Sequence, residues 1–82
     1  LKEFTSAKVH VYPNPAAEFV MTESDEELTE CTVYNIQGAA VLKQIIGKEH
    51  SVKLDCSALS PGIYLLNVQT KNRTALHKLI IQ

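Results

Sequence analysis

Three histidines are the first candidates for metal binding or acid–base catalysis in this sequence. His10, His50 and His77 lie in or beside three different predicted strands, and none has a second ligand-type residue two or four positions further on. A metal site needs several converging ligands, and nucleophilic catalysis needs a nucleophile, a base and an orienting group. A lone histidine in a strand is more often a half-exposed filler, so we predict no metal site here.

The densest group of carboxylates is the run over residues 23–27, with Asp55 as a separate acid. Two such acids can serve glycoside hydrolysis when an apolar environment raises the pKa of one of them. Nothing apolar surrounds the run, and no further asparagine, glycine or acid completes a calcium-loop spacing. We therefore expect a solvated loop at residues 23–27, with an electrostatic role left open.

The only cysteines are Cys31 and Cys56, too few for a disulfide framework and wrongly spaced for a zinc site. A bridge between them is possible in an oxidising compartment. Cys31 falls at an apolar position of a predicted strand, where a small buried thiol serves equally well. Both alternatives stay open on the sequence.

The remaining motifs also lack catalytic chemistry. Gly38, Gly47 and Gly62 are single turn residues rather than a phosphate-binding loop. Residues 72–74 (NRT) fit a glycosylation acceptor, but a hairpin turn explains them as well. We predict that the chain is not an enzyme and binds no cofactor.

Composition excludes two classes of partner. The 82 residues carry a net charge of −1, and no basic residues alternate with the few aromatic ones, so nucleic-acid binding is not expected. No apolar run approaches the roughly 18 residues of a transmembrane helix. Because Leu1 is not an initiator methionine, we expect the chain to begin inside a longer polypeptide whose export signal lies further upstream.

The elements that would position any site are short strands. After a lead-in over residues 1–7, a single domain over residues 8–82 shows alternating or β-branched segments divided by Pro, Gly or Asn/Asp turns. The expected strands cover residues 8–12, 17–22, 28–36, 39–46, 51–54, 63–70 and 74–82. About seven antiparallel strands of this kind predict an all-β, immunoglobulin-like sandwich.

The stretch over residues 59–70 organises this prediction. Pro61 and Gly62 make a sharp turn that opens a strand. Leu59 and Tyr64 flank that turn, a spacing that lets the leucine plug one end of the sheet while the tyrosine hydroxyl reaches back to loop backbone. This is the arrangement of a tyrosine corner.

Four blocks in order carry a resemblance to a known family. They are residues 11–16 (VYPNPA), 33–38 (VYNIQG), 59–64 (LSPGIY) and 78–82 (KLIIQ). Together they closely resemble the type A C-terminal sorting domain of the type IX secretion system of Bacteroidetes, along nearly the whole chain. The resemblance implies a targeting signal on a secreted cargo protein, which the outer-membrane translocon recognises in the periplasm. It also implies that a sortase-like enzyme commonly removes the domain and attaches the cargo to the cell surface.

The family signature falls on eleven positions of this sequence. They are Pro13, Asn14, Pro15, Gly38, Gly62, Tyr64, Lys78, Leu79, Ile80, Ile81 and Gln82. A strand stop, a hairpin turn and a sandwich corner explain the first three blocks without a receptor. The last strand is apolar on both sides, so we expect its edge to be available for strand addition to a partner or for self-association.

Two functions from different classes remain. The first is a secretion signal read by the export machinery. The second is a retained immunoglobulin-like or fibronectin-like module that binds a glycan, a neighbouring domain or its own copy, and it is suggested by the two-sided apolar final strand.

Overall fold

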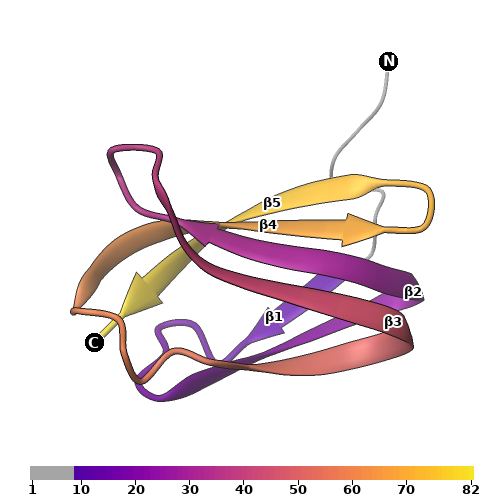
Figure 1. The fold of residues 1–82 in the computed structure, drawn as a ribbon. Helices are drawn as coiled ribbons and strands as arrows, with labels where there is room; N and C mark the ends of the chain where they lie inside the picture. The colour runs from indigo at the N-terminus through magenta and orange to yellow at the C-terminus, as the bar shows by residue number, and fades with distance from the viewer. Residues whose placement is uncertain (1–8) are drawn as a thin grey trace.

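Five antiparallel strands make up one curled sheet in the computed structural model, which describes residues 9–82 (Figure 1). The strands are β1 (Val9–Tyr12), β2 (Phe19–Tyr34), β3 (Ala40–Asp55), β4 (Gly62–Thr70) and β5 (Thr74–Ile81). No helix occurs within residues 9–82. The all-β antiparallel class is therefore confirmed, while the lead-in expected over residues 1–7 lies outside the described residues.

The long strand β2 is the centre of the sheet. β3 runs beside almost its whole length, from the pair Phe19–Asp55 to the pair Tyr34–Ala40. On its other side β2 pairs first with β1 and then with β4, which continues to β5. In Figure 1 the sheet curls so that β4 and β5 lie above β1 and the first half of β2. Two halves of one sheet thus enclose a common interior.

The sandwich of about seven strands is not confirmed, because two predicted turns lie inside strands. The acidic residues 23–27 belong to β2, and residues 47–49 belong to β3. The β2–β3 register shifts between Glu23 and Leu28, opposite a segment where Lys48 has a positive φ of 59°. A bulge adds residues to a paired strand and bends it without ending the pairing. Four predicted strands therefore merge into two bent ones.

Both halves of the curled sheet contribute to the core. Val20 and Leu54 come from the first half, whereas Leu66, Val68 and Leu79 come from the second, and all five are buried. Interdigitated aliphatic side chains from two facing layers are the usual way in which a small β-domain excludes water. The core therefore fixes β4 and β5 against the opposite half.

The two cysteines are free thiols in this same core. Burial raises the pKa of the Cys31 thiol to about 11, with a smaller contribution from the charge of Glu30. Burial also raises the pKa of Cys56. The structure thus agrees with the buried-thiol alternative rather than with a bridge.

Candidate functional site

The Pro-Asn-Pro motif lies against the final strand. The exposed Asn14 side chain spans two residues of β5: its Nδ2 donates to the carbonyl of Lys78 at 2.8 Å, and its Oδ1 accepts from the amide of Ile80 at 3.1 Å. An asparagine side chain carries the donor and acceptor of a peptide group, so Asn14 pairs with β5 as a strand residue would.

Ala16 continues this pairing through its backbone. Its amide donates to the carbonyl of Ile80 and its carbonyl accepts from the amide of Gln82, both at 2.8 Å. Ala16 forms a parallel bridge with Ile81 and is only 1% exposed. We call residues 13–16 the β5 clamp, and residues 78–82 the terminal segment.

The clamp extends one expectation and corrects another. Residues 13–15 were expected to stop a strand, and β1 does end at Tyr12; the segment beyond it also holds the end of β5. The final strand was expected to offer its edge for strand addition. Along the terminal segment that edge is bonded to the chain's own backbone and to Asn14, because the carbonyl and amide of Ile80 are both occupied.

The predicted tyrosine corner is present on the neighbouring strand. The Tyr64 hydroxyl donates to the carbonyl of Ser60 at 2.7 Å, and Leu59 packs on the core as a partly buried residue. Gly62 pairs with Ile81, and Tyr64 pairs with Leu79. The corner therefore supports the terminal segment from the side opposite the clamp.

Gly38 belongs to a different feature, the tip of the β2–β3 hairpin. It adopts a left-handed φ of 87° and its amide donates to the carbonyl of Asn35. The Asn35 side chain accepts from the amides of Gln37 and Ala39, which closes the turn. Glycine suits this position because other residues rarely adopt a positive φ. The predicted hairpin tip is confirmed, and Gly38 is not part of the clamp.

A groove of about 510 Å³ connects the hairpin tip with β4 and β5. Its apolar walls come from Tyr34, Ile36, Ile63 and Leu65, and among residues 9–82 Lys78 is the one charged residue that lines it. Ile36 is 78% exposed and Ile63 is 53% exposed, so both present apolar surface to solvent. An apolar concavity beside an exposed charge is a common form of binding site.

The terminal segment has one accessible face. Leu79 and Ile81 are buried in the core, whereas Lys78 is exposed and Ile80 is half-buried. Since the clamp occupies the edge of this segment, a partner meets it through the face that carries Lys78 and Ile80. That face continues directly into the groove.

Comparison with known proteins adds an independent observation. Residues 10–82 match the family described as the secretion system C-terminal sorting domain. The chain belongs to this family. It is also 33% identical over 75 residues to Beta-agarase D of Zobellia galactanivorans, a match that covers 90% of this chain and 15% of the agarase. The sorting domain thus spans about 15% of the length of that relative.

Family membership fixes the general role. The sorting domain is a targeting signal for type IX secretion, and its family is non-catalytic. Membership of this family implies interaction with the type IX machinery and export to the cell surface or extracellular space. In the part of the chain that the structure describes, no helix is long and apolar enough to cross a membrane.

The histidines do not converge on a metal site in the sorting domain. Within residues 9–82 no group of three or more His, Cys, Asp or Glu side chains could hold a metal ion. His77 lies on β5, where burial lowers its pKa and the nearby His10 lowers it further. This pair spans β1 and β5, and no third ligand joins it in the described part of the chain.

The acidic run has a structural role that the sequence did not reveal. Glu26 accepts a hydrogen bond from the Thr70 hydroxyl at 2.6 Å and lies 3.7 Å from the Arg73 guanidinium. The carbonyl of Glu27 accepts from the amide of Lys71. The expected solvated loop is therefore wrong: these residues form part of β2 and hold the β4–β5 turn.

Sequence reasoning named Asn14 but not its partners, and it missed Ala16. One signal was available: the prolines on either side of Asn14 lack N–H groups, so the local hydrogen-bond donors are the backbone amide and the side chain of Asn14 itself. That signal gives a donor without saying which strand accepts.

Proposed function

We propose that the sorting domain carries a cargo through the periplasm to the type IX outer-membrane translocon, which reads the exposed face of the terminal segment. Lys78 supplies the charge of this face, and Ile80 with the adjoining groove supplies its apolar surface. The cargo then crosses the outer membrane. In this proposal a sortase-like transpeptidase removes the domain and attaches the cargo to the cell surface.

One observation supports this proposal above the others. The terminal segment is held on both sides, by the clamp and by β4, while Lys78 stays exposed beside an apolar groove. A fixed, partly apolar surface loses little conformational entropy when it binds, which favours recognition. The segment therefore has the properties of a preformed recognition surface.

A reporter fusion tests export. Residues 1–82 are joined to the C-terminus of a reporter that is delivered to the periplasm, in strains with and without a working type IX system. We expect the reporter outside the cell only in the strain with the system. A reporter that stays periplasmic in both strains would contradict the proposal.

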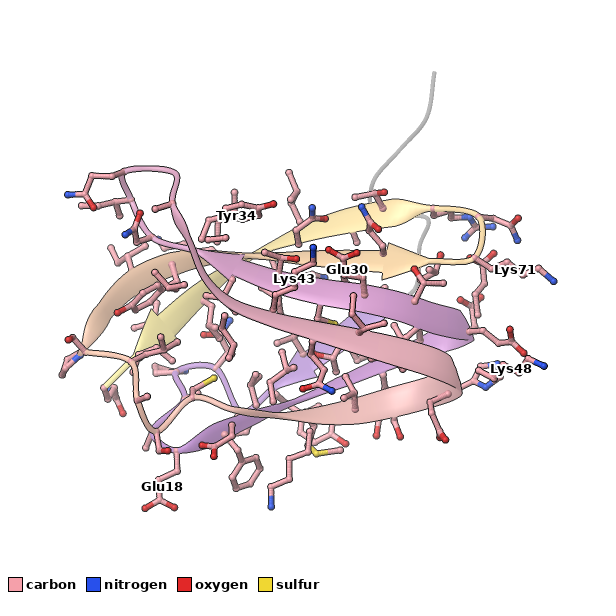
Figure 2. All side chains as sticks on the ribbon, in the orientation of Figure 1. Glu18, Glu30, Tyr34, Lys43, Lys48 and Lys71 are labelled. Atoms are coloured by element: carbon pink, nitrogen blue, oxygen red, sulfur yellow. The ribbon has the colours of Figure 1, made fainter. Side chains whose placement is uncertain are left out.

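Lys78→Glu tests the recognition face without touching the core. Lys78 is exposed, so reversal of its charge should leave the fold intact. In this proposal Lys78 meets an acidic surface of the translocon, so Lys78→Glu places two negative charges together, which costs about 1.4 kcal/mol or more and reduces export by tenfold or more. Lys71→Glu is the matched control. Lys71 is exposed at the β4–β5 turn, at the far end of the sheet from Tyr34, which lines the groove together with Lys78 (Figure 2). Equal export of both variants would exclude Lys78 from recognition.

Cleavage is tested on the same fusion by mass spectrometry of the exported reporter. We expect the surface-attached form to lack residues 9–82. Export of an intact fusion that stays on the surface would instead support the second candidate, a retained binding or assembly module. The exposed apolar residues Ile36, Ile63 and Leu65 favour that candidate, because such a surface also suits a neighbouring domain. Neither role involves catalysis, and we expect the isolated domain to show no hydrolytic activity.

A further inference from the structure

The β5 clamp connects parts of the chain that are far apart in sequence. Asn14 is 64 residues from Lys78 and 66 residues from Ile80, yet its side chain bonds to both. β1 ends at Tyr12, which pairs with Met21 of β2, so the clamp begins directly from a strand of the first half of the sheet. The first strand and the last are thereby joined through four residues.

We propose that Asn14 is a positioning residue for recognition: it holds the terminal segment in the geometry that the machinery reads, and does not itself contact the machinery. This inference rests on the proposed function for its export readout. Its structural part depends only on the hydrogen bonds of the clamp.

The hydrogen bonds of Asn14 favour a positioning role over direct contact with the machinery. Both polar atoms of the Asn14 side chain already bond to the backbone of the terminal segment. A partner that bound this amide in the same way would have to displace β5. The simpler use of these bonds is to keep β5 in place.

The terminal segment needs such support. β5 pairs with β4 on one side, and the last pair of that ladder is Gly62–Ile81. The end of an edge strand frays readily when it is bonded on only one side. The clamp supplies the second side, and the Lys78 and Ile80 side chains alternate with the buried Leu79 and Ile81 only while this segment stays extended.

The clamp has a second effect on possible partners. An unpaired strand edge pairs readily with other chains. Asn14 and Ala16 occupy the outward carbonyl and amide of Ile80 and the amide of Gln82. Strand pairing with another chain is therefore blocked at Ile80 and Gln82, and we expect the terminal segment to be recognised through its side chains.

Asn14→Ala tests the proposal, with Asn72→Ala as the matched control. Asn72 is an exposed asparagine in the turn at the other end of β5, and its side chain contacts Glu26 at 3.5 Å. Amide hydrogen exchange is measured on the 82-residue chain, and export on the reporter fusion. We expect Asn14→Ala to speed exchange at Ile80 by about fivefold to tenfold, the factor that corresponds to one lost hydrogen bond, and to reduce export. Asn72→Ala should change neither.

Asn14→Asp is the second variant, and it separates the two bonds. A carboxylate still accepts from the Ile80 amide but cannot donate to the Lys78 carbonyl. Its second oxygen replaces a donor that lies 2.8 Å from the Lys78 carbonyl oxygen, and the two oxygens repel each other. We therefore expect exchange at Ile80 and export to lie between the values of the unsubstituted chain and those of Asn14→Ala. If Asn14 positions the terminal segment, export across these variants should correlate with the exchange rate at Ile80. If Asn14 only stabilises the fold, export should instead correlate with the melting temperature.

Two outcomes would overturn the inference. Faster exchange at Ile80 with undiminished export would show that the terminal segment need not be held. Lost export with unchanged exchange would show that Asn14 is contacted directly. If the unsubstituted fusion is not exported, the proposed function fails, and the positioning role fails with it.

Discussion

The two ends of β5 are held by different chemistry. At the Thr74 end, the Glu26 carboxylate accepts from the Thr70 hydroxyl and lies near Arg73, so the contact carries charge. At the Gln82 end, Asn14 and Ala16 make neutral bonds to backbone groups. Charge-assisted bonds respond to pH and salt, whereas neutral backbone bonds respond to neither. The end that carries the signature is thus the one that solution conditions affect least.

Burial also differs between these ends. Beside the clamp, the buried side chains of β5 are Leu79 and Ile81, whereas the buried residue near the turn is the small Ala75. Apolar area removed from water stabilises by about 25 cal/mol per Å². Packing therefore adds stability to the Gln82 end of β5, which we call the neutral end. The Thr74 end, which we call the charged end, depends more on its hydrogen bonds.

Ile81→Ala should break the neutral end most severely. Ile81 is 3% exposed and lies between Gly62 and Ala16, so its truncation leaves a cavity under the clamp. We expect the free energy of unfolding to fall by about 3 kcal/mol, measured by urea denaturation. Leu76→Ala is the control: Leu76 is 48% exposed on the same strand and should cost about 0.5 kcal/mol. Similar losses for both variants would mean that packing does not distinguish the two ends.

Thr70→Val should weaken the charged end by a smaller amount. The substitution keeps the shape of a buried side chain but removes the hydroxyl that donates to Glu26 and accepts from the amide of Arg73. We expect a loss of about 1.5 kcal/mol in the same measurement. Thr29→Val is matched to it, because the Thr29 hydroxyl donates to a neutral acceptor, the carbonyl of Gln69, at an exposed site. A larger loss at Thr29 would contradict the importance of charge at this end.

The sequence predicted contacts that span a few residues. The Tyr64 hydroxyl bonds to Ser60, four residues away, and Asn35 closes the hairpin tip within four residues. The Asp55 carboxylate accepts from the Ser57 amide, two residues away, in a contact of the same local kind. In each case, residue type and spacing determine the geometry, because few backbone conformations bring the groups together.

Contacts across the sheet could not be predicted in this way. The Asn14 bonds and the Glu26–Thr70 bond depend on which strands become neighbours, and that is decided by the pairing of the whole sheet. The same reason explains the strand count. Gly47 and the acidic residues 23–27 look like turns locally, but pairing between β2 and β3 continues on either side of them, and tertiary context overrides local preference in strands.

A pH series on Glu26→Gln distinguishes the two ends with the smallest effect. The Thr70 hydroxyl bond holds the pKa of the Glu26 carboxyl below its ordinary value of 4.5, and Asn72 and Arg73 act in the same direction. A carboxyl with a lowered folded pKa stabilises the fold above its unfolded pKa and loses that contribution as the pH falls through the folded value. The difference in free energy of unfolding between the unsubstituted chain and Glu26→Gln should therefore be constant above about pH 5 and shrink below it. The corresponding difference for Asn14→Ala should not change over the same pH range, because the partners of Asn14 are backbone groups. A difference for Glu26→Gln that stays constant at acidic pH would show that the carboxylate charge does not stabilise the turn.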